Sequence, residues 1–169
     1  MTADWETATD PGEVHDLLLA SDLHVAASYG LPVPQRNPHS TELLVGEGRV
    51  HLLRVDGAAA AMFALTSTPA FEVDLGIFPP AVRPAYLRRL AVRPERLADG
   101  ELYGPMCVRR ATEEAARSGA GALRAETNPD LAGIVRLLEA FGFRRYGPVR
   151  TEGWMRRVYL ACDLGSFTR

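Results

Sequence analysis

The sequence from Tyr86 to Gly104, YLRRLAVRPERLADGELYG, combines a strand pattern, a short loop with one central glycine and the start of a helix. The first N–H groups of an α-helix have no acceptor within the helix and carry partial positive charge, so such a start can bind a phosphate. Residues 122–128 have the next strand pattern, and a second helix after them ends before Gly142-Phe143. We therefore predict a core of strand, loop, helix, strand and helix.

The strand pattern at residues 122–128 directly follows a predicted helix over residues 103–118. A strand that is reached from its predecessor through a helix lies parallel to that predecessor, by a right-handed crossover. The strands at 86–92 and 122–128 are therefore expected to be parallel neighbours. The helix that follows them is predicted over residues 131–141.

The N-terminal part of the chain predicts an edge strand followed by two short helices. The strand is expected at residues 5–9. Asp10 suits the N-cap of the first helix, with Pro11 at the first helical position and Glu13 placed for a capping box. Ser21-Asp22 predicts the N-cap of a second helix that ends at Gly30.

Turn residues divide the remaining chain. Three prolines and Asn37 predict a loop over residues 31–40. Asp56-Gly57 lies between two apolar runs and predicts a tight hairpin over residues 49–66. Residues 67–85 are either a long loop or an edge strand with prolines at its ends, and such a loop commonly carries specificity. Closing strands are predicted at residues 143–146 and 153–162.

The composition is that of an ordinary globular domain. The 169 residues are 47% hydrophobic and 24% charged, with a net charge of −2, which gives no case for binding nucleic acid or an anionic membrane. All 19 basic residues are arginine, which together with many alanines indicates the codon bias of a GC-rich, bacterial genome. The sequence shows neither a signal-peptide pattern nor an apolar run long enough to span a membrane, so we expect a cytoplasmic protein.

The cysteines and histidines give no pattern of a metal or redox site. Cys107 and Cys162 are far apart and are expected to be buried apolar residues, with a catalytic thiol or a disulfide as the alternatives. The four histidines are scattered without metal-ligand spacing, so no metal site is predicted.

Residues 87–143 resemble the GNAT N-acetyltransferase superfamily. Leu90-Ala-Val-Arg-Pro94 matches the Leu-x-Val-x-Pro end of that family's fourth strand, and Gly142-Phe143 matches the end of its fourth helix. The window Leu97–Leu102 stands in place of the family's loop motif Gln/Arg-x-x-Gly-x-Gly/Ala and shares only Gly100 with it. The resemblance implies an α/β (α+β) fold in a single domain over residues 1–169. Its mixed, mostly antiparallel sheet would have about six or seven strands, one parallel splayed pair and about four flanking helices.

The resemblance also implies acetyl-CoA as co-substrate. Backbone N–H groups near the start of the helix at residue 103 would surround the pyrophosphate. Backbone groups of Leu90 and Val92 would pair with the pantetheine amides as an added strand does. Asp99 and Glu101 depart from the family by placing carboxylates in this loop. The implied binding residues are Leu90, Ala91, Val92, Leu97, Ala98, Asp99, Gly100, Glu101, Leu102, Tyr103, Gly104, Asn128 and Leu138.

In this family an amine attacks the thioester carbonyl directly. The reaction needs a base for the ammonium proton and a backbone N–H for the oxyanion. Glu126 and Glu72 are the predicted bases, with Asp74 as a further alternative. The resemblance implies the N–H of Val92 as the oxyanion donor.

The family often uses a tyrosine to protonate the leaving thiolate, and this chain has Leu138 at that position. A thiol pKa of about 8.5 lets the thiolate leave without an acid, so activity is compatible with Leu138. Tyr146 and Tyr103 are alternative donors.

We therefore predict an acyl-CoA-dependent N-acyltransferase that transfers acetyl or another short acyl group to a primary amine of a small molecule or protein. The alternative is a degenerate member of the fold that binds acyl-CoA or another ligand without turnover. The leucines at positions 97, 102 and 138 favour this alternative. The sequence leaves the acceptor and the oligomeric state open, including a homodimer.

Overall fold

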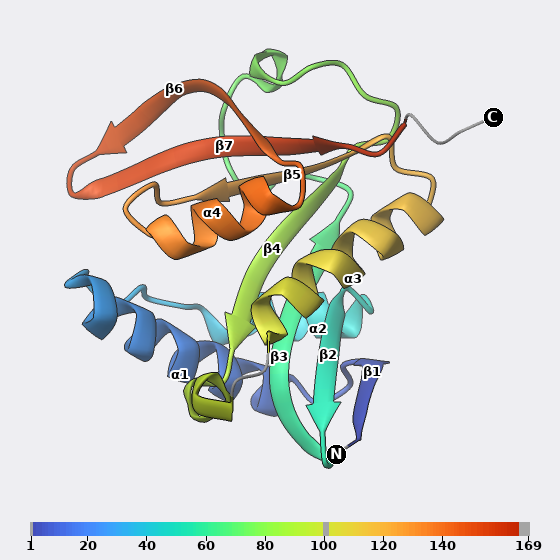
Figure 1. The fold of residues 1–169 in the computed structure, drawn as a ribbon, viewed down its shortest axis with the longest axis vertical. Helices are drawn as coiled ribbons and strands as arrows, with labels where there is room; N and C mark the ends of the chain where they lie inside the picture. Colours follow the sequence, from blue (N-terminus) through green and yellow to red (C-terminus); the bar gives the residue numbers. More distant parts are fainter. Residues whose placement is uncertain (1, 100–101, 166–169) are drawn as a thin grey trace. The chain divides into compact units, whose positions relative to one another are not determined.

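The computed structural model describes residues 2–99 and 102–165. Its strands form a seven-stranded sheet in the order β1-β2-β3-β4-β5-β7-β6 (Figure 1). Neighbours β4 and β5 are parallel, whereas β1–β2, β2–β3, β5–β7 and β6–β7 are antiparallel. This mixed, mostly antiparallel sheet with four described α-helices confirms the predicted fold class.

The elements follow the chain in an order close to the prediction. They are β1 (Ala3–Thr7), α1 (Pro11–Tyr29), α2 (Pro38–Gly46), β2 (Val50–Val55), β3 (Ala58–Thr66), the 3-10 helix η1 (Leu75–Ile77), β4 (Ala85–Val92), the 3-10 helix η2 (Pro94–Asp99), α3 (Tyr103–Arg117), β5 (Ala122–Thr127), α4 (Ala132–Ala140), β6 (Arg144–Glu152) and β7 (Met155–Asp163).

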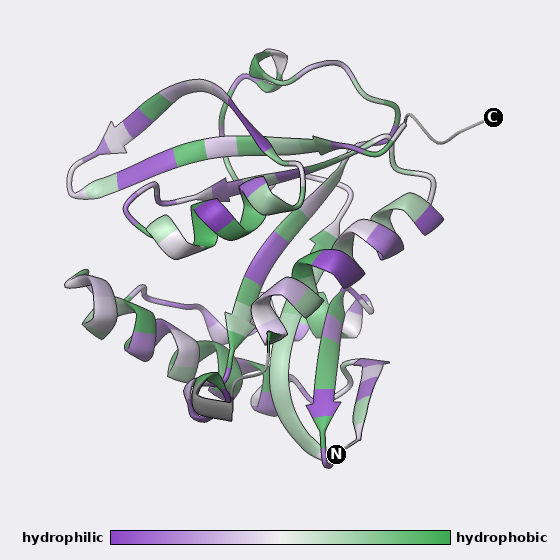
Figure 2. Cartoon of the chain, viewed as in Figure 1, coloured by the Kyte–Doolittle hydropathy of each residue, from purple (hydrophilic) through white to green (hydrophobic). Residues whose placement is uncertain are grey.

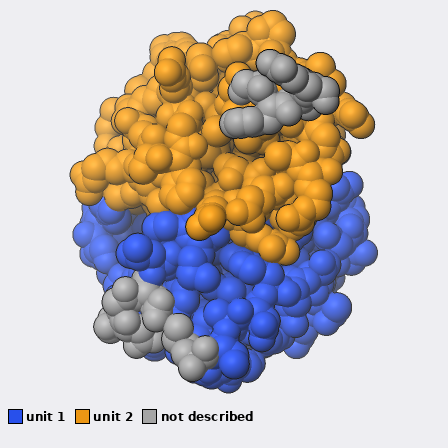
Figure 3. Space-filling view, turned by 45° about the vertical axis from the view of Figure 1, so that its right-hand side comes forward, with its two compact units in different colours: residues 1–64, 89–107 blue, residues 65–88, 108–169 orange. Residues whose placement is uncertain are grey.

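The chain divides into two compact units, which Figure 3 colours separately. Unit 1 comprises residues 1–64 and 89–107, and unit 2 comprises residues 65–88 and 108–169. The single domain over residues 1–169 stays a prediction.

Unit 1 contains the predicted hairpin of β2 and β3. Asp56 and Gly57 have φ angles of 51° and 83°, as a type I′ turn requires at both central residues. Apolar side chains of α1, among them Leu17 and Leu18, are buried in one cluster with Leu52 of β2. The hairpin therefore supplies the surface on which α1 packs.

The N-terminal helix differs from the prediction of two short helices. Asp10 is the N-cap, and its side chain accepts hydrogen bonds from the N–H groups of Gly12 and Glu13. The helix then continues through Ser21 and Asp22 to Tyr29 as the single helix α1. These two residues do not act as caps because Ser21 is buried in the helix and Asp22 forms an ion pair with Arg36 at 2.8 Å.

Glu13 does not serve as the second half of a capping box. Its carboxylate binds Arg54 of β2, with Oε1 2.6 Å from Nη2, and Glu6 of β1 binds the same guanidinium at 2.7 Å. The hydrogen bonds to Glu13, and the charges of both carboxylates, raise the pKa of Arg54 above its usual value. This arginine therefore links β1, β2 and α1.

The prediction of a loop over residues 31–40 was wrong for residues 38–40, which are helical. Helix α2 begins at Pro38, and the side chain of Asn37 caps it by accepting from the N–H of His39. A proline at the first helical position needs no N–H acceptor, so it starts this helix instead of interrupting it.

Unit 2 contains β5 between β4 and β7, with β6 at the edge. The hydropathy colouring shows β7 hydrophilic near its start and mostly hydrophobic afterwards (Figure 2). Residues 67–84 form a loop that contains η1, so the alternative of an extra edge strand was wrong. Strand β6 runs to Glu152, six residues beyond the predicted end at Tyr146.

Gly121 gives a test of the packing in unit 2. Its N–H donates to the carbonyl of Val82 at 2.7 Å, and a Cβ at residue 121 would lie 2.9 Å from that carbonyl oxygen. We expect Gly121→Ala to lower the free energy of unfolding by about 1–3 kcal/mol in urea denaturation, because the two backbone segments must separate. Gly46→Ala, where nothing lies within 4 Å, is the matched control and should cause no loss. Equal midpoints for both variants would contradict the close backbone approach.

Candidate functional site

The parallel ladder between β4 and β5 is short. It pairs Ala85 with Leu123, Tyr86 with Arg124 and Leu87 with Ala125, and it ends there, although β5 continues to Thr127. Arg89 follows with φ 55°, a left-handed conformation that is rare for a residue with a side chain. The ladder therefore has three parallel pairs, and the splay of the two strands beyond them stays a prediction.

The N–H of Val92 points away from β3. The next residue, Arg93, donates its N–H to the carbonyl of Ala60 on β3 at 2.8 Å. Successive N–H groups of an extended strand point to opposite edges, so the N–H of Val92 faces the other edge of β4. The role of this N–H as the oxyanion donor stays a prediction.

One face of unit 2 is an aromatic cluster under the loop at residues 67–84. The ring of Phe71 lies 5.8 Å from that of Tyr86 and 5.1 Å from that of Tyr159. Arg124 of β5 connects the loop to the sheet. Its guanidinium donates to the hydroxyl of Tyr86 at 3.0 Å and to the carbonyl of Pro79 at 3.1 Å. The central carbon of the guanidinium lies 4.6 Å from the ring centre of Phe78. The loop is therefore ordered by named contacts with β4, β5 and β7.

Glu126 is two residues after Arg124 on β5 and so lies on the same face. Its Oε1 is 3.6 Å from Nε of Arg157, whereas its Oε2 is buried and has no hydrogen-bond partner among the described residues. Tyr159 is the cross-strand partner of Glu126. Burial, and secondarily a side-chain hydrogen bond with the Glu126 carboxylate and its charge, raise the pKa of Tyr159 to about 12. The site thus offers a carboxylate oxygen that can accept a hydrogen bond from a ligand.

The other predicted bases face outward. Glu72 is exposed, between Phe71 and Val73, which pack on the aromatic cluster. Asp74 uses Oδ1 to accept the N–H of Gly76 at 2.8 Å, and so caps η1. The structure places neither carboxylate beside Glu126.

The predicted cofactor-binding residues have different environments. In unit 1, Leu97 is 50% exposed and Leu102 is 69% exposed, so both predicted departures from the family motif point to solvent. Ala91 and Tyr103 are buried, while Leu90, Val92 and Gly104 are half-buried. Ala98 and Asp99 end η2, and Gly100 and Glu101 lie outside the described residues.

In unit 2, Asn128 and Leu138 have structural contacts. Asn128 directly follows β5, and its Oδ1 accepts the N–H of Asp130 at 2.8 Å. Leu138 is buried in α4, with 2% of its surface exposed. The position that often holds a tyrosine in the resembled family therefore contributes only apolar packing here.

Sequence reasoning missed Tyr159 and Arg88. Tyr159 is distant in sequence from Glu126, and only the β5–β7 register brings them together. Arg88 is half-buried in β4, where burial lowers its pKa. Two consecutive arginines inside an otherwise apolar strand were the signal that could have singled it out.

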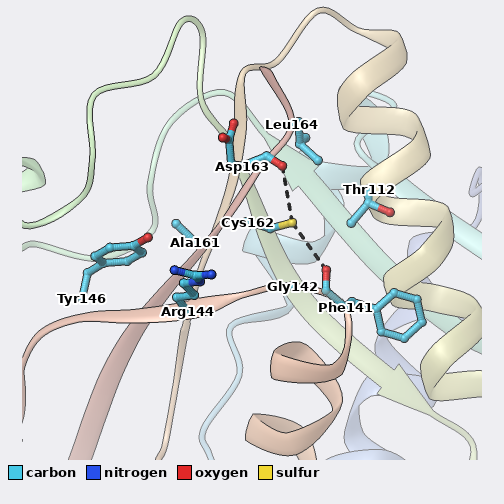
Figure 4. Close-up of a pocket in the computed structure, with 9 residues that line it drawn as sticks. All are labelled: Thr112, Phe141, Gly142, Arg144, Tyr146, Ala161, Cys162, Asp163 and Leu164. Atoms are coloured by element: carbon cyan, nitrogen blue, oxygen red, sulfur yellow. Dashed lines mark hydrogen bonds between the residues drawn. The ribbon is translucent and has the colours of Figure 1, made fainter. Parts of the chain in front are cut away.

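A separate cavity of about 620 Å³ lies in unit 2 beside the end of β7 (Figure 4). The thiol of Cys162 lies in its wall and hydrogen-bonds to the carbonyl of Phe141 at 3.5 Å. Burial, and secondarily Asp163, raise the pKa of this thiol. The cavity therefore holds a protonated thiol and no activated nucleophile among its lining residues, which are Thr112, Phe141, Gly142, Arg144, Tyr146, Ala161, Cys162, Asp163 and Leu164.

The histidines and acidic residues show no metal-binding arrangement in the described part of the chain. Over residues 2–99 and 102–165, no three His, Cys, Asp or Glu side chains come together as ligands. Across the same residues, no helix has the length and apolar composition needed to cross a bilayer.

Solved acetyltransferase structures share this fold over nearly the whole chain. The ribosomal-protein-S18-alanine N-acetyltransferase from Escherichia coli has a TM-score of 0.73 at 16% identity, covering 99% of this chain and 97% of that chain. A GNAT-family acetyltransferase from Streptococcus agalactiae has a TM-score of 0.69 at 15% identity, covering 95% of each chain. The chain has the GNAT acetyltransferase fold.

A third GNAT-fold structure has a bound cofactor. It is a Salmonella typhimurium protein described as an acetyltransferase and solved with acetyl-CoA, with a TM-score of 0.66 at 14% identity over 100% of this chain and 98% of that chain. No protein-family model matches the chain, and a comparison with curated proteins gives no match either. The likeness confirms the predicted GNAT resemblance at the level of the fold, and the activity must be argued from the residues.

The cysteines give a pH-dependent prediction. Burial raises the pKa of Cys107 to about 12. An unfolded thiol ionises near pH 9, so between about pH 9 and pH 12 the unfolded state loses its proton first and the free energy of unfolding falls. We expect urea denaturation to show this fall in the wild type and a smaller fall in Cys107→Ala. Native protein should also react with a thiol reagent at pH 8 at least about tenfold more slowly than unfolded protein. Rapid labelling of Cys107 without unfolding would contradict its burial.

Proposed function

We propose that this protein is an acyl-CoA-dependent N-acyltransferase that transfers an acetyl group to a primary amine. The observation that carries the proposal is Glu126, a half-buried carboxylate whose Oε2 is buried with no partner in the described chain. An unsatisfied buried acceptor is costly unless a ligand completes it, so this oxygen suits the ammonium group of an acceptor. Its place on β5, just beyond the end of the parallel ladder, supports the role of general base.

Two structural features of the chain are compatible with a bound acyl-CoA. Beyond Leu87 the register no longer pairs β4 with β5, and the N–H of Val92 points to the edge of β4 opposite β3. Helix α3 begins at Tyr103, and the partial positive charge of a helix start favours a phosphate there, although Pro105 removes one N–H from its first turn. The other predicted binding residues, including Gly100 and Glu101, stay part of this proposal.

When bound, acetyl-CoA supplies a thioester whose carbonyl carbon accepts the amine. Glu126 takes the ammonium proton onto its carboxylate, which leaves the nitrogen lone pair free to attack. The N–H of Val92 donates to the thioester oxygen as negative charge develops there. Leu138 offers no proton to the leaving thiolate, which would instead take the second proton that the nitrogen loses as the amide forms, directly or through a tyrosine.

Binding without turnover is the second candidate, because Leu138 is buried and apolar where the resembled family often has an acid. The presence of Glu126 as a candidate general base favours turnover over binding alone. Thiol release with a panel of primary amines separates the two, and the absence of lysine keeps the protein's own side-chain amines out of the assay.

Acetyl-CoA and CoA should each raise the melting temperature of the protein. A ligand that binds only the folded state stabilises it by mass action, by about 2.7 kcal/mol at a concentration of 100 Kd. The measurement is a thermal melt with each compound up to millimolar concentration, with ATP as a phosphate-bearing control. If neither compound stabilises the protein more than ATP does, the proposed acyl-CoA site is wrong.

Replacing the proposed base should reduce turnover without reducing cofactor binding. For Glu126→Gln we expect kcat to fall by about 10²- to 10⁴-fold, because the amide keeps the shape but cannot accept the proton. The acetyl-CoA-induced shift in melting temperature should stay unchanged. Glu72→Gln tests the other predicted base in the same assay, and a loss of turnover there with a fully active Glu126→Gln would reverse the assignment.

A further inference from the structure

Arg88 and Glu126 occupy the positions that directly follow the last pair of the parallel ladder, Leu87 with Ala125. Tyr86 of β4 pairs with Arg124 of β5, and two residues further along each strand stand Arg88 and Glu126. Side chains two residues apart on a strand share a face, so both belong to the face that carries the aromatic cluster. The left-handed residue Arg89 comes only after this position.

The environment of Arg88 differs from that of the other arginines on this face. Arg124 donates to Tyr86 and Pro79, and Arg157 lies 3.6 Å from both Glu126 and Glu152. The side chain of Arg88 is half-buried and makes no hydrogen bond or ion pair among the described residues. None of its nitrogens is among the buried, unpartnered atoms of the described chain, so the guanidinium reaches solvent and is available to a ligand.

Arg88 and Glu126 carry opposite charges but do not form an ion pair with each other. No ion-pair contact links Arg88 to Glu126 within the described chain, and Oε2 of Glu126 stays buried without a donor. Arg157 and Tyr159 are the other polar groups that face Glu126 from β7. We call Arg88 and the Oε2 of Glu126 the Arg88–Glu126 site.

We propose that Arg88 binds an oxyanion of the acceptor, so that the acceptor is a small amine with its own carboxylate or phosphate-type group. Glu126 holds the ammonium group, and the planar guanidinium of Arg88 binds the anionic group through paired N–H donors. This inference rests on the proposed function and deepens it, because it selects amino-acid-like zwitterions over alkylamines and lysine side chains. It makes Arg88 a specificity-determining residue.

The test compares Arg88→Leu and Arg88→Lys with the wild type in thiol release at saturating acetyl-CoA. The acceptors are L-alanine, L-methionine and L-phenylalanine, their carboxamides, and aminomethylphosphonate. Each carboxamide keeps the primary amine and removes the negative charge, and comparing variant with wild type for each amine cancels differences in intrinsic reactivity. Arg49→Leu, which removes one exposed positive charge from unit 1, is the matched control.

We expect Arg88→Leu to raise KM for the carboxylate amines by about 10- to 100-fold, the size of a lost charge-assisted hydrogen-bond pair. KM for the carboxamides should change by less than about twofold, and Arg49→Leu should behave as wild type. Arg88→Lys should recover part of the affinity, since it keeps the charge without the planar fork. A stronger effect on aminomethylphosphonate than on the amino acids would assign a phosphate-type acceptor.

Two results would overturn the proposal. One is an equal loss for amino acids and carboxamides, which would make Arg88 a structural residue. The other is weaker binding of acetyl-CoA in Arg88→Leu, which would assign the guanidinium to the cofactor phosphates. If the wild type releases no thiol with any amine, the proposed turnover fails, and direct calorimetric titration of the same amino acids decides about Arg88. Binding that Arg88→Leu weakens at least tenfold then supports the site, and no binding rejects it.

Discussion

The early end of the β4–β5 ladder is the constraint on which the other site features depend. Backbone N–H and C=O groups inside a sheet normally satisfy one another, and a register of only three pairs leaves the next groups to find other partners. Arg88 and Glu126 occupy the first positions after the last of these pairs. The proposed site depends on this interruption, because there the main chain would supply donors and acceptors that a longer ladder would use itself.

Local patterns predicted most of the fold because local chemistry determines those elements. The Asp56-Gly57 turn, the N-cap at Asp10 and the strand–helix–strand core all follow from backbone preferences within a few residues. The errors occurred where distant contacts override a local signal. The sequence alone predicts Asp22 as an N-cap, but in the structure Asp22 forms an ion pair with Arg36. Pro38 was predicted to lie in a loop, but it begins helix α2, which Asn37 caps.

The candidate site was predicted less completely, for a related reason. Glu126 could be selected from the sequence because it lies in a recognisable strand. Its unsatisfied oxygen, its neighbour Tyr159 and the unmatched charge of Arg88 depend on strand register, which no short window of sequence contains. The exposure of the Glu72 side chain likewise follows from the inward packing of its neighbours Phe71 and Val73, which the sequence does not show.

Arg124 is one attachment of the 67–84 loop to the sheet, beside the packing of Phe71 and Val73. Its contacts with Tyr86, Phe78 and Pro79 hold one part of the loop, while Glu72 and Gly76 stay exposed. A substitution at the exposed residues therefore leaves these attachments in place, so what the loop presents to its surroundings is separable from how the loop is held.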